Sequence, residues 1–244
     1  MHAVLLVLVL PLAMDVEGLE AELHLETGMA LLHQGLLDQA EEEFSSALEL
    51  GEEYTDALLG LGLVNLGRES WTAASEYLRR FIEVCPADHR GYLEMAGLYL
   101  LTGKADSAAI MADSAFMRAP TKPSIWLLCG KVSLAVERLD EAEMWFSRGV
   151  DHGGETSMES LVLLASVYRR TQRGQEARDI LMPAVDNGYA PASWELAKVY
   201  LGWDDYLRAG DAIRRYLLLS PRGVYSDSAR LVLEELGESG EYME

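Results

Sequence analysis

The segment from Tyr92 to Pro120 reads YLEMAGLYLLTGKADSAAIMADSAFMRAP, and its small residues decide the fold. Ala96 is followed twelve positions later by Ala108, and a Thr-Gly-Lys turn signal separates the two. Two helices pack most closely where each has a small side chain at the contact, because their backbones approach each other there. The segment therefore predicts a helix, a short turn and a second helix that ends at Pro120, since proline cannot continue a helix.

The same spacing of small residues recurs along the chain. A glycine or alanine followed twelve residues later by alanine occurs six times, at Gly28/Ala40, Gly62/Ala74, Ala96/Ala108, Gly130/Ala142, Ala165/Ala177 and Ala197/Ala209. Successive pairs lie 34, 34, 34, 35 and 32 residues apart, a period typical of helical repeat proteins. A left-handed residue is expected to end the first helix of a unit, and the candidates are Gly35, Gly67, Gly103 and Gly174.

The third unit resembles the tetratricopeptide-repeat (TPR) family. That family has an aromatic residue, a small residue and a tyrosine in its first helix, and here Tyr92, Ala96 and Tyr99 stand in those places. Its second helix carries alanines and ends on proline, as Ala108 and Pro120 do. The resemblance covers about residues 21–221. It implies an all-α fold, a right-handed superhelical solenoid of about six helix-turn-helix repeats plus a C-terminal capping helix.

The chain is expected to divide into four parts: a possible signal peptide or apolar N-terminal segment at residues 1–18, a six-unit array at 21–221, a capping helix at 222–236 and an acidic tail at 237–244. Pro183 lies inside the second helix of the fifth unit and should bend or shorten it, because proline removes a backbone donor. The following NGYAPASWELAKVYLGW resembles the related Sel1-like repeat.

The N-terminal segment is apolar at every position from Ala3 to Ala13. This run is shorter than the roughly 20 residues that span a bilayer, so no stable membrane span is expected. Its length fits a signal-peptide core, with cleavage after Ala13 or Gly18, and predicts an exported or periplasmic protein. No Lys or Arg precedes the run. The alternative is an apolar helix that docks on the array of a cytoplasmic protein.

Composition and motifs exclude several classes of function. Forty acidic residues against twenty basic ones give a net charge of -20, which opposes binding to nucleic acid and to anionic lipid headgroups. The chain contains no HExxH, GxSxG or GxxxxGK[ST] motif, and no pair of histidines has helical metal-ligand spacing. Cys85 and Cys129 form no CxxC pair. We therefore expect no catalysis, no cofactor and no metal.

The TPR resemblance also implies a concave groove lined by the first helices. The positions that it assigns to the groove are Leu25, Met29, Leu59, Leu63, Leu93, Leu127, Lys131, Arg169, Arg170, Trp194 and Lys198. The first three units would offer an apolar wall, and the last three would offer cations for acidic groups of a ligand. The family's carboxylate clamp is absent, because Leu25, Met29, Leu59 and Leu63 stand where its polar residues belong. The competing interpretation is that these leucines are packed between helices or covered by the N-terminal segment.

The sequence thus predicts a non-catalytic interaction scaffold that binds a partner peptide or helix in an apolar groove. Two alternatives stay open. One is a self-assembling structural module, suggested by the apolar N-terminus. The other is a carrier of a lipid or small molecule. The identity of the protein partner is not encoded in any motif of the chain.

Overall fold

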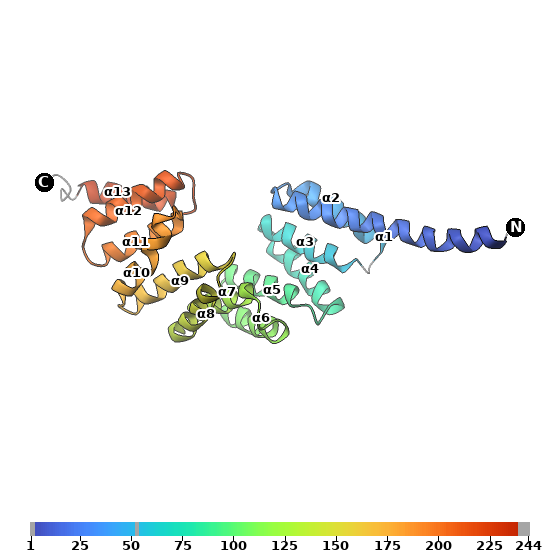
Figure 1. Cartoon of the computed structure of the whole chain (residues 1–244), viewed down its shortest axis with the longest axis horizontal. Helices are drawn as coiled ribbons and strands as arrows, with labels where there is room; N and C mark the ends of the chain where they lie inside the picture. The colour runs from blue at the N-terminus through green and yellow to red at the C-terminus, as the bar shows by residue number, and fades with distance from the viewer. Residues whose placement is uncertain (1–2, 52–53, 239–244) are drawn as a thin grey trace. The chain divides into compact units, whose positions relative to one another are not determined.

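The computed structural model describes residues 3–51 and 54–238, with side chains over 18–51 and 54–237. Within these ranges the chain forms thirteen α-helices and no strand. Contacts divide the chain into two compact units, residues 1–121 and residues 122–244. Each unit is a stack of consecutive helix pairs (Figure 1). The predicted all-α architecture of helix-turn-helix repeats is therefore confirmed.

Six helices form the first unit: α1 (Ala3–His33), α2 (Leu37–Leu50), α3 (Thr55–Gly67), α4 (Trp71–Val84), α5 (His89–Leu101) and α6 (Ala105–Arg118). Seven form the second: α7 (Pro123–Ala135), α8 (Leu139–His152), α9 (Ser157–Arg170), α10 (Gly174–Asp186), α11 (Ala190–Leu201), α12 (Tyr206–Leu219) and α13 (Ser226–Glu238). Odd-numbered helices from α1 to α11 are the first helices of the repeats, and each packs on the even-numbered helix that follows it.

The predicted close contacts lie where the sequence places them. All twelve members of the six small-residue pairs are buried, and the alanines among them are fully inaccessible. A Cβ atom on Gly28 would lie 2.8 Å from the Phe44 ring, and one on Gly62 would lie 2.8 Å from Leu78. The small residue of a first helix is thus the place where a large side chain of the second helix meets its backbone.

The turns between paired helices correct two of the glycine assignments. A residue with positive φ follows every first helix from α1 to α11, at Gly35, Glu69, Gly103, Glu137, Gln172 and Asp204. Gly67 instead ends α3, where a Cβ atom would approach Leu37 at 3.3 Å, and Gly174 begins α10 beneath Trp203. These two glycines are small because of packing, and Glu69 and Gln172 adopt the left-handed conformation in their units.

Each of these turns closes with the same hydrogen bond. The amide of the residue after the left-handed position donates to a carbonyl five residues earlier, as from Leu36 to Leu31 at 3.0 Å and from Lys104 to Tyr99 at 2.8 Å. This bond satisfies a carbonyl at the end of the first helix. The backbone therefore forms an identical turn in every repeat, whether or not a glycine is present.

The fifth repeat and the C-terminus depart modestly from the expected boundaries. Helix α10 continues through the exposed Pro183 to Asp186 and is the shortest of the second helices from α2 to α12. The C-terminal helix α13 spans 226–238 rather than 222–236 and packs on α12, with Ala229 and Leu236 buried in the core. In the part of the chain that the structure describes, no helix is long and apolar enough to cross a bilayer.

Candidate functional site

The predicted groove positions differ widely in exposure. Leu59, Leu127 and Trp194 are only 7%, 7% and 8% exposed, and each belongs to a hydrophobic core cluster. Leu25, Leu63 and Leu93 are half-buried, and Met29 is exposed. The expectation of an open leucine wall is therefore corrected at Leu59 and Leu127, because neighbouring helices cover these side chains. That the remaining positions bind a partner stays a prediction.

The four basic groove positions are not free cations. Ion pairs join Lys131 to Glu159 at 2.6 Å, Arg169 to Glu195 at 3.0 Å, Arg170 to Glu137, and Lys198 to Glu195. The Glu195 side chain is only 4% exposed, and a buried carboxylate requires such partners. Arg169 and Lys198 thus hold a carboxylate of the protein itself, on the adjoining faces of α9 and α11.

A pocket of about 400 Å³ opens between α9 and α11 in the second unit. Two predicted groove positions of α11, Trp194 and Lys198, line it together with Val162 and Ser166 of α9. Leu163, Tyr189, Pro191 and Tyr225 add apolar and aromatic surface, and Glu159 and Glu195 add carboxylates. The repeat register therefore brings first-helix residues of two units into one concave site.

Aromatic side chains form one side of this pocket. Trp194 and Tyr225 stack with ring centroids 5.8 Å apart, and Tyr216 lies 5.9 Å from Trp194 on the core side. The Lys198 ammonium lies 5.9 Å from the Trp194 ring. Burial, with a smaller effect of the nearby Glu159 charge, raises the pKa of the Tyr189 phenol, which keeps it neutral.

Sequence reasoning missed most of the residues that line this site, and three of them show why. Tyr225 precedes α13 and reaches the pocket only because that helix folds back on α12. Tyr189 lies in the turn before α11. Glu195 could have been identified from the sequence, because it is the single carboxylate in the otherwise apolar stretch ASWELA and a buried carboxylate requires a partner.

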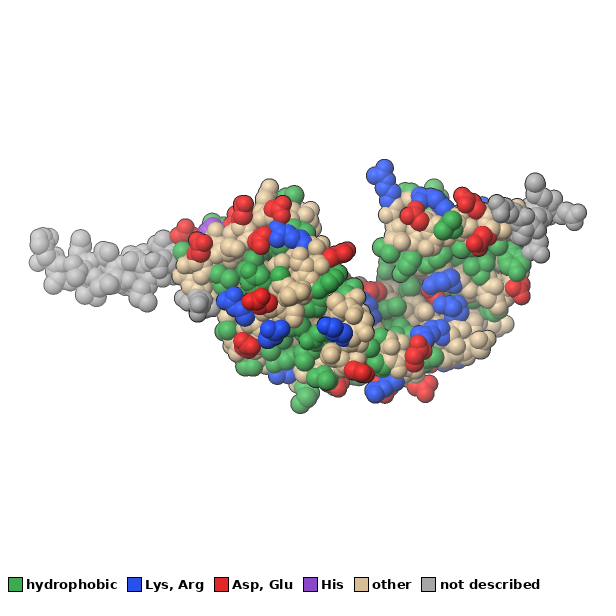
Figure 2. All heavy atoms as spheres, turned by 180° about the vertical axis from the view of Figure 1, so that it is seen from behind, with side chains coloured by type: hydrophobic (Ala, Val, Ile, Leu, Met, Phe, Trp, Pro, Cys, Tyr) green, Lys and Arg blue, Asp and Glu red, His purple; other side chains and the backbone are tan. Residues whose placement is uncertain are grey.

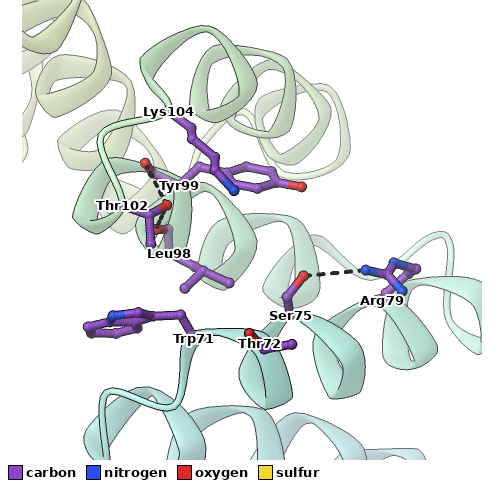
Figure 3. A pocket seen from close by; sticks show the side chains of 8 residues that line it. All are labelled: Trp71, Thr72, Ser75, Arg79, Leu98, Tyr99, Thr102 and Lys104. Atoms are coloured by element: carbon purple, nitrogen blue, oxygen red, sulfur yellow. Dashed lines mark hydrogen bonds between the residues drawn. The ribbon is translucent and has the colours of Figure 1, made fainter.

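A second pocket, of about 240 Å³, lies in the first unit between α4 and α5. Figure 3 shows Trp71, Thr72, Ser75 and Arg79 on α4 and Leu98 and Tyr99 on α5, with Thr102 and Lys104 in the turn that follows. None of these eight residues belongs to the predicted groove positions. At this site Arg79 donates a hydrogen bond to Ser75 Oγ at 3.5 Å.

Acidic and basic side chains are mixed rather than segregated on the surface that one view shows. On the face shown in Figure 2, acidic and basic side chains are interspersed over each unit. Many arginines bind carboxylates, as Arg68 does with Asp38 at 2.5 Å and Glu41 at 2.6 Å. Among the described residues, no group of three or more His, Cys, Asp or Glu side chains is arranged to hold a metal ion.

Comparisons with known proteins agree with this geometry. The family model described as "Tetratricopeptide repeat" matches residues 12–55 and 25–89. A comparison with curated proteins returns no match. The search of solved structures gives similar folds at low sequence identity, which is informative about the fold alone.

Three of these structures illustrate the similarity. The APC/C hetero-tetramer Cut9–Hcn1 matches with a TM-score of 0.78 at 17% identity, over 89% of this chain and 43% of that one, so this chain spans less than half of its length. PilF of Pseudomonas aeruginosa matches with a TM-score of 0.73 at 16% identity, over 91% of this chain and 99% of that one. YrrB, described as "a TPR protein with an unusual peptide-binding site", matches with a TM-score of 0.54 at 15% identity, over 77% and 97%.

The matched segment runs from within α1 to the end of α4, and the same pairing of helices, buried small residues and turn geometry continues through α12. The chain thus matches the tetratricopeptide-repeat family model over residues 12–89, and its fold is similar to that of solved tetratricopeptide-repeat proteins.

Proposed function

We propose that this protein is a non-catalytic interaction scaffold that holds a segment of a partner protein against α9 and α11. The partner inserts one apolar or aromatic side chain into the pocket between these helices. The observation that carries this proposal is the pocket itself, which combines first-helix residues of two repeats with a stacked aromatic pair. Its volume lies within the range of roughly 300–1,000 Å³ that is usual for ligand sites.

The chemistry of the lining supports an apolar side chain as the anchor. Val162, Leu163 and Pro191 provide apolar contacts, and Trp194 and Tyr225 provide flat aromatic surface. The charged groups in the pocket, Glu159, Glu195 and Lys198, already have ion-pair partners, so a charged anchor would have to displace one of them. Large apolar side chains in well-packed pockets also contribute most of the affinity of protein interfaces.

The match to the tetratricopeptide-repeat family model supports the same proposal. TPR arrays generally act as protein-interaction scaffolds, and the structurally similar YrrB is described as having a peptide-binding site. Those properties belong to the relatives, and the present proposal extends them to this chain through the α9–α11 pocket.

A displayed library of random peptides tests the proposal directly. Peptides selected on the full chain should share a large apolar or aromatic residue, flanked by variable positions. Ser166→Trp fills the pocket and should weaken the best peptides at least about tenfold, which corresponds to losing roughly 1.4 kcal/mol. Ser228→Trp, on the exposed surface of α13, is the matched control and should leave the affinity unchanged.

Two results would contradict the proposal. One is the recovery of peptides that bind wild type and Ser166→Trp equally well, while circular dichroism shows both proteins folded. The other is a selection that yields no apolar anchor at all. Either outcome removes the pocket as the interaction site.

We also propose that the protein is exported, on the strength of the apolar run at residues 3–13. The first buried side chain of α1 among the described residues is Ala21, which lies beyond both predicted cleavage positions. The intact mass of the protein purified from its native source checks this. A mass lower by residues 1–13 or 1–18 is expected, and the mass of the uncleaved chain would contradict export by this route.

A further inference from the structure

The pocket between α4 and α5 combines apolar surface with basic side chains that have no carboxylate partner among the described residues. Trp71, Leu98 and Tyr99 give it apolar surface, and Trp71 and Tyr99 are half-buried against the core cluster that contains Leu98. Packing on that cluster fixes both rings, so the apolar surface is formed before any ligand binds. A fixed aromatic surface favours a flat apolar group over a flexible one.

The two basic residues of this pocket have no carboxylate partner in the part of the chain that the structure describes. Within the described residues, Arg79 and Lys104 form no ion pair with a carboxylate. Arg79 donates only a long hydrogen bond to Ser75 Oγ, and the Lys104 ammonium lies 5.8 Å from the centre of the Tyr99 ring. Figure 3 shows Lys104 extended over Tyr99 and Arg79 lying beyond Ser75.

Two other arginines of the first unit, Arg68 and Arg90, are neutralised by carboxylates. Arg68 binds Asp38 and Glu41, and Arg90 binds Asp56 and Asp88. In a chain with a net charge of -20, carboxylates are abundant enough to pair with most cations. Two unpaired cations at one pocket are therefore a local concentration of positive charge that the protein itself does not satisfy.

The hydroxyl groups of the pocket add hydrogen-bonding capacity. Thr102 donates to the Leu98 carbonyl at 2.9 Å, so its proton is already used. Thr72 forms no hydrogen bond within the described residues and lies at the start of α4 with its side chain exposed. Its hydroxyl is free to donate to a ligand oxygen.

We propose that the α4–α5 pocket binds a carboxylate attached to a flat apolar body, such as an aromatic acid. The apolar body packs between Trp71 and Tyr99, and the carboxylate accepts hydrogen bonds from Arg79, Lys104 and Thr72. The site lies in the first unit and is independent of the interaction pocket between α9 and α11. The carboxylate has two possible sources, a free small molecule or an acidic peptide side chain beside an aromatic residue.

Titration of the full ¹⁵N-labelled chain with phenylacetate tests the site. The reporter is the indole N–H signal of Trp71, assigned by its loss in Trp71→Phe. A ligand of this size is expected to bind in about the millimolar range. Phenylacetate should bind about fivefold or more tightly than the neutral phenylacetamide, because only the anion gains charge-assisted hydrogen bonds. Benzylammonium should bind more weakly than either.

Arg80, the sequence neighbour of Arg79, provides a matched control. Arg79→Gln and Lys104→Gln should each reduce the preference for phenylacetate over phenylacetamide, whereas Arg80→Gln, whose residue does not line the pocket, should preserve it. All three changes fall on exposed side chains and are expected to leave the helical circular dichroism intact. Raising the salt concentration should weaken phenylacetate alone.

A second titration distinguishes the two sources. The peptide acetyl-Phe-Glu-amide is compared with acetyl-Phe-Gln-amide, and tighter binding of the acidic peptide than of phenylacetate indicates a peptide ligand. The reverse order indicates a free aromatic acid. Equal binding of phenylacetate and phenylacetamide to the Trp71 site, or undiminished preference in both Arg79→Gln and Lys104→Gln, overturns the proposal.

Discussion

The ring of Phe44 on α2 lies against the backbone of Gly28 on α1, so closely that a Cβ atom at position 28 would lie 2.8 Å from the ring. The same ring also meets Gly60 on α3, where an added Cβ atom would lie at 2.5 Å. One fully buried phenylalanine therefore joins two repeats by occupying the space that two missing side chains leave.

Gly28→Ala is accordingly expected to lower the free energy of unfolding by about 1–3 kcal/mol, because the buried ring must move to accept a methyl group. Gly97→Ala is the matched control, since an added Cβ atom there contacts nothing within 4 Å. It should raise stability by about 0.5–1 kcal/mol through helix propensity. Urea denaturation measures both changes, and an equal effect of the two substitutions would refute the packing argument.

At a left-handed turn residue, replacement by glycine is expected to raise the free energy of unfolding. Glu69 has a φ of 57°, a conformation that costs an ordinary residue about 1–2 kcal/mol. Glu69→Gly should therefore stabilise the protein by roughly 1 kcal/mol, after the greater entropy of glycine in the unfolded chain is deducted. Gly103→Ala, at the equivalent turn with a φ of 72°, should destabilise it by a similar amount. Thermal melts of the two variants that shift in the same direction would contradict this account.

Two adjacent arginines allow a buried ion pair to be compared with an exposed one. Arg169 binds Glu195, whose side chain is 4% exposed, while Arg170 binds Glu137, whose side chain is 73% exposed. Arg169→Gln should cost about 1–3 kcal/mol, because it leaves a buried carboxylate with Lys198 as its remaining charged partner. Arg170→Gln should change stability by less than about 1 kcal/mol. Chemical denaturation of both variants at the same ionic strength decides between this expectation and equal effects.

The stability of the first unit should also respond to pH through Glu94. Burial raises the pKa of its carboxyl above the usual value, so the folded state holds this proton more tightly than the unfolded state does. The contribution of Glu94 to stability therefore falls as the pH rises from below its usual pKa through the raised one. Glu94→Gln should stabilise the protein near about pH 7, and the gain should shrink toward about pH 4.

The matched control for that measurement is Glu76→Gln, which changes an exposed carboxylate on α4. Its difference from wild type should vary much less with pH than that of Glu94→Gln. Denaturation curves for the three proteins across this range provide the test. A gain for Glu94→Gln that stays constant with pH would show that ionisation is not its cause.

Much of the fold could be predicted because its determinants recur. The pairs from Gly28/Ala40 to Ala197/Ala209 mark helix contacts, and all of them are buried. The turn glycines were less reliable as signals. Gly67 and Gly174 are small because Leu37 and Trp203 pack over them, and glycine alone does not distinguish a packing role from a left-handed one.

The candidate site was only partly predictable. Register placed Trp194 and Lys198 on the groove side of α11, and both residues do line one pocket. The same register also selected Leu59 and Leu127, which neighbouring side chains cover. Position on a helix gives the direction of a side chain, whereas exposure depends on what the adjacent repeat places against it.

The sequence by itself determined the repeat, since small residues at a fixed interval permit close helix contacts only in one pairing. The tertiary structure decided which of the remaining side chains are available. It paired Arg169 and Lys198 with Glu195, brought Tyr225 to Trp194, and left Arg79 and Lys104 without carboxylate partners beside Trp71. These outcomes depend on distances between residues far apart in the chain, and a local periodic pattern carries no information about such distances.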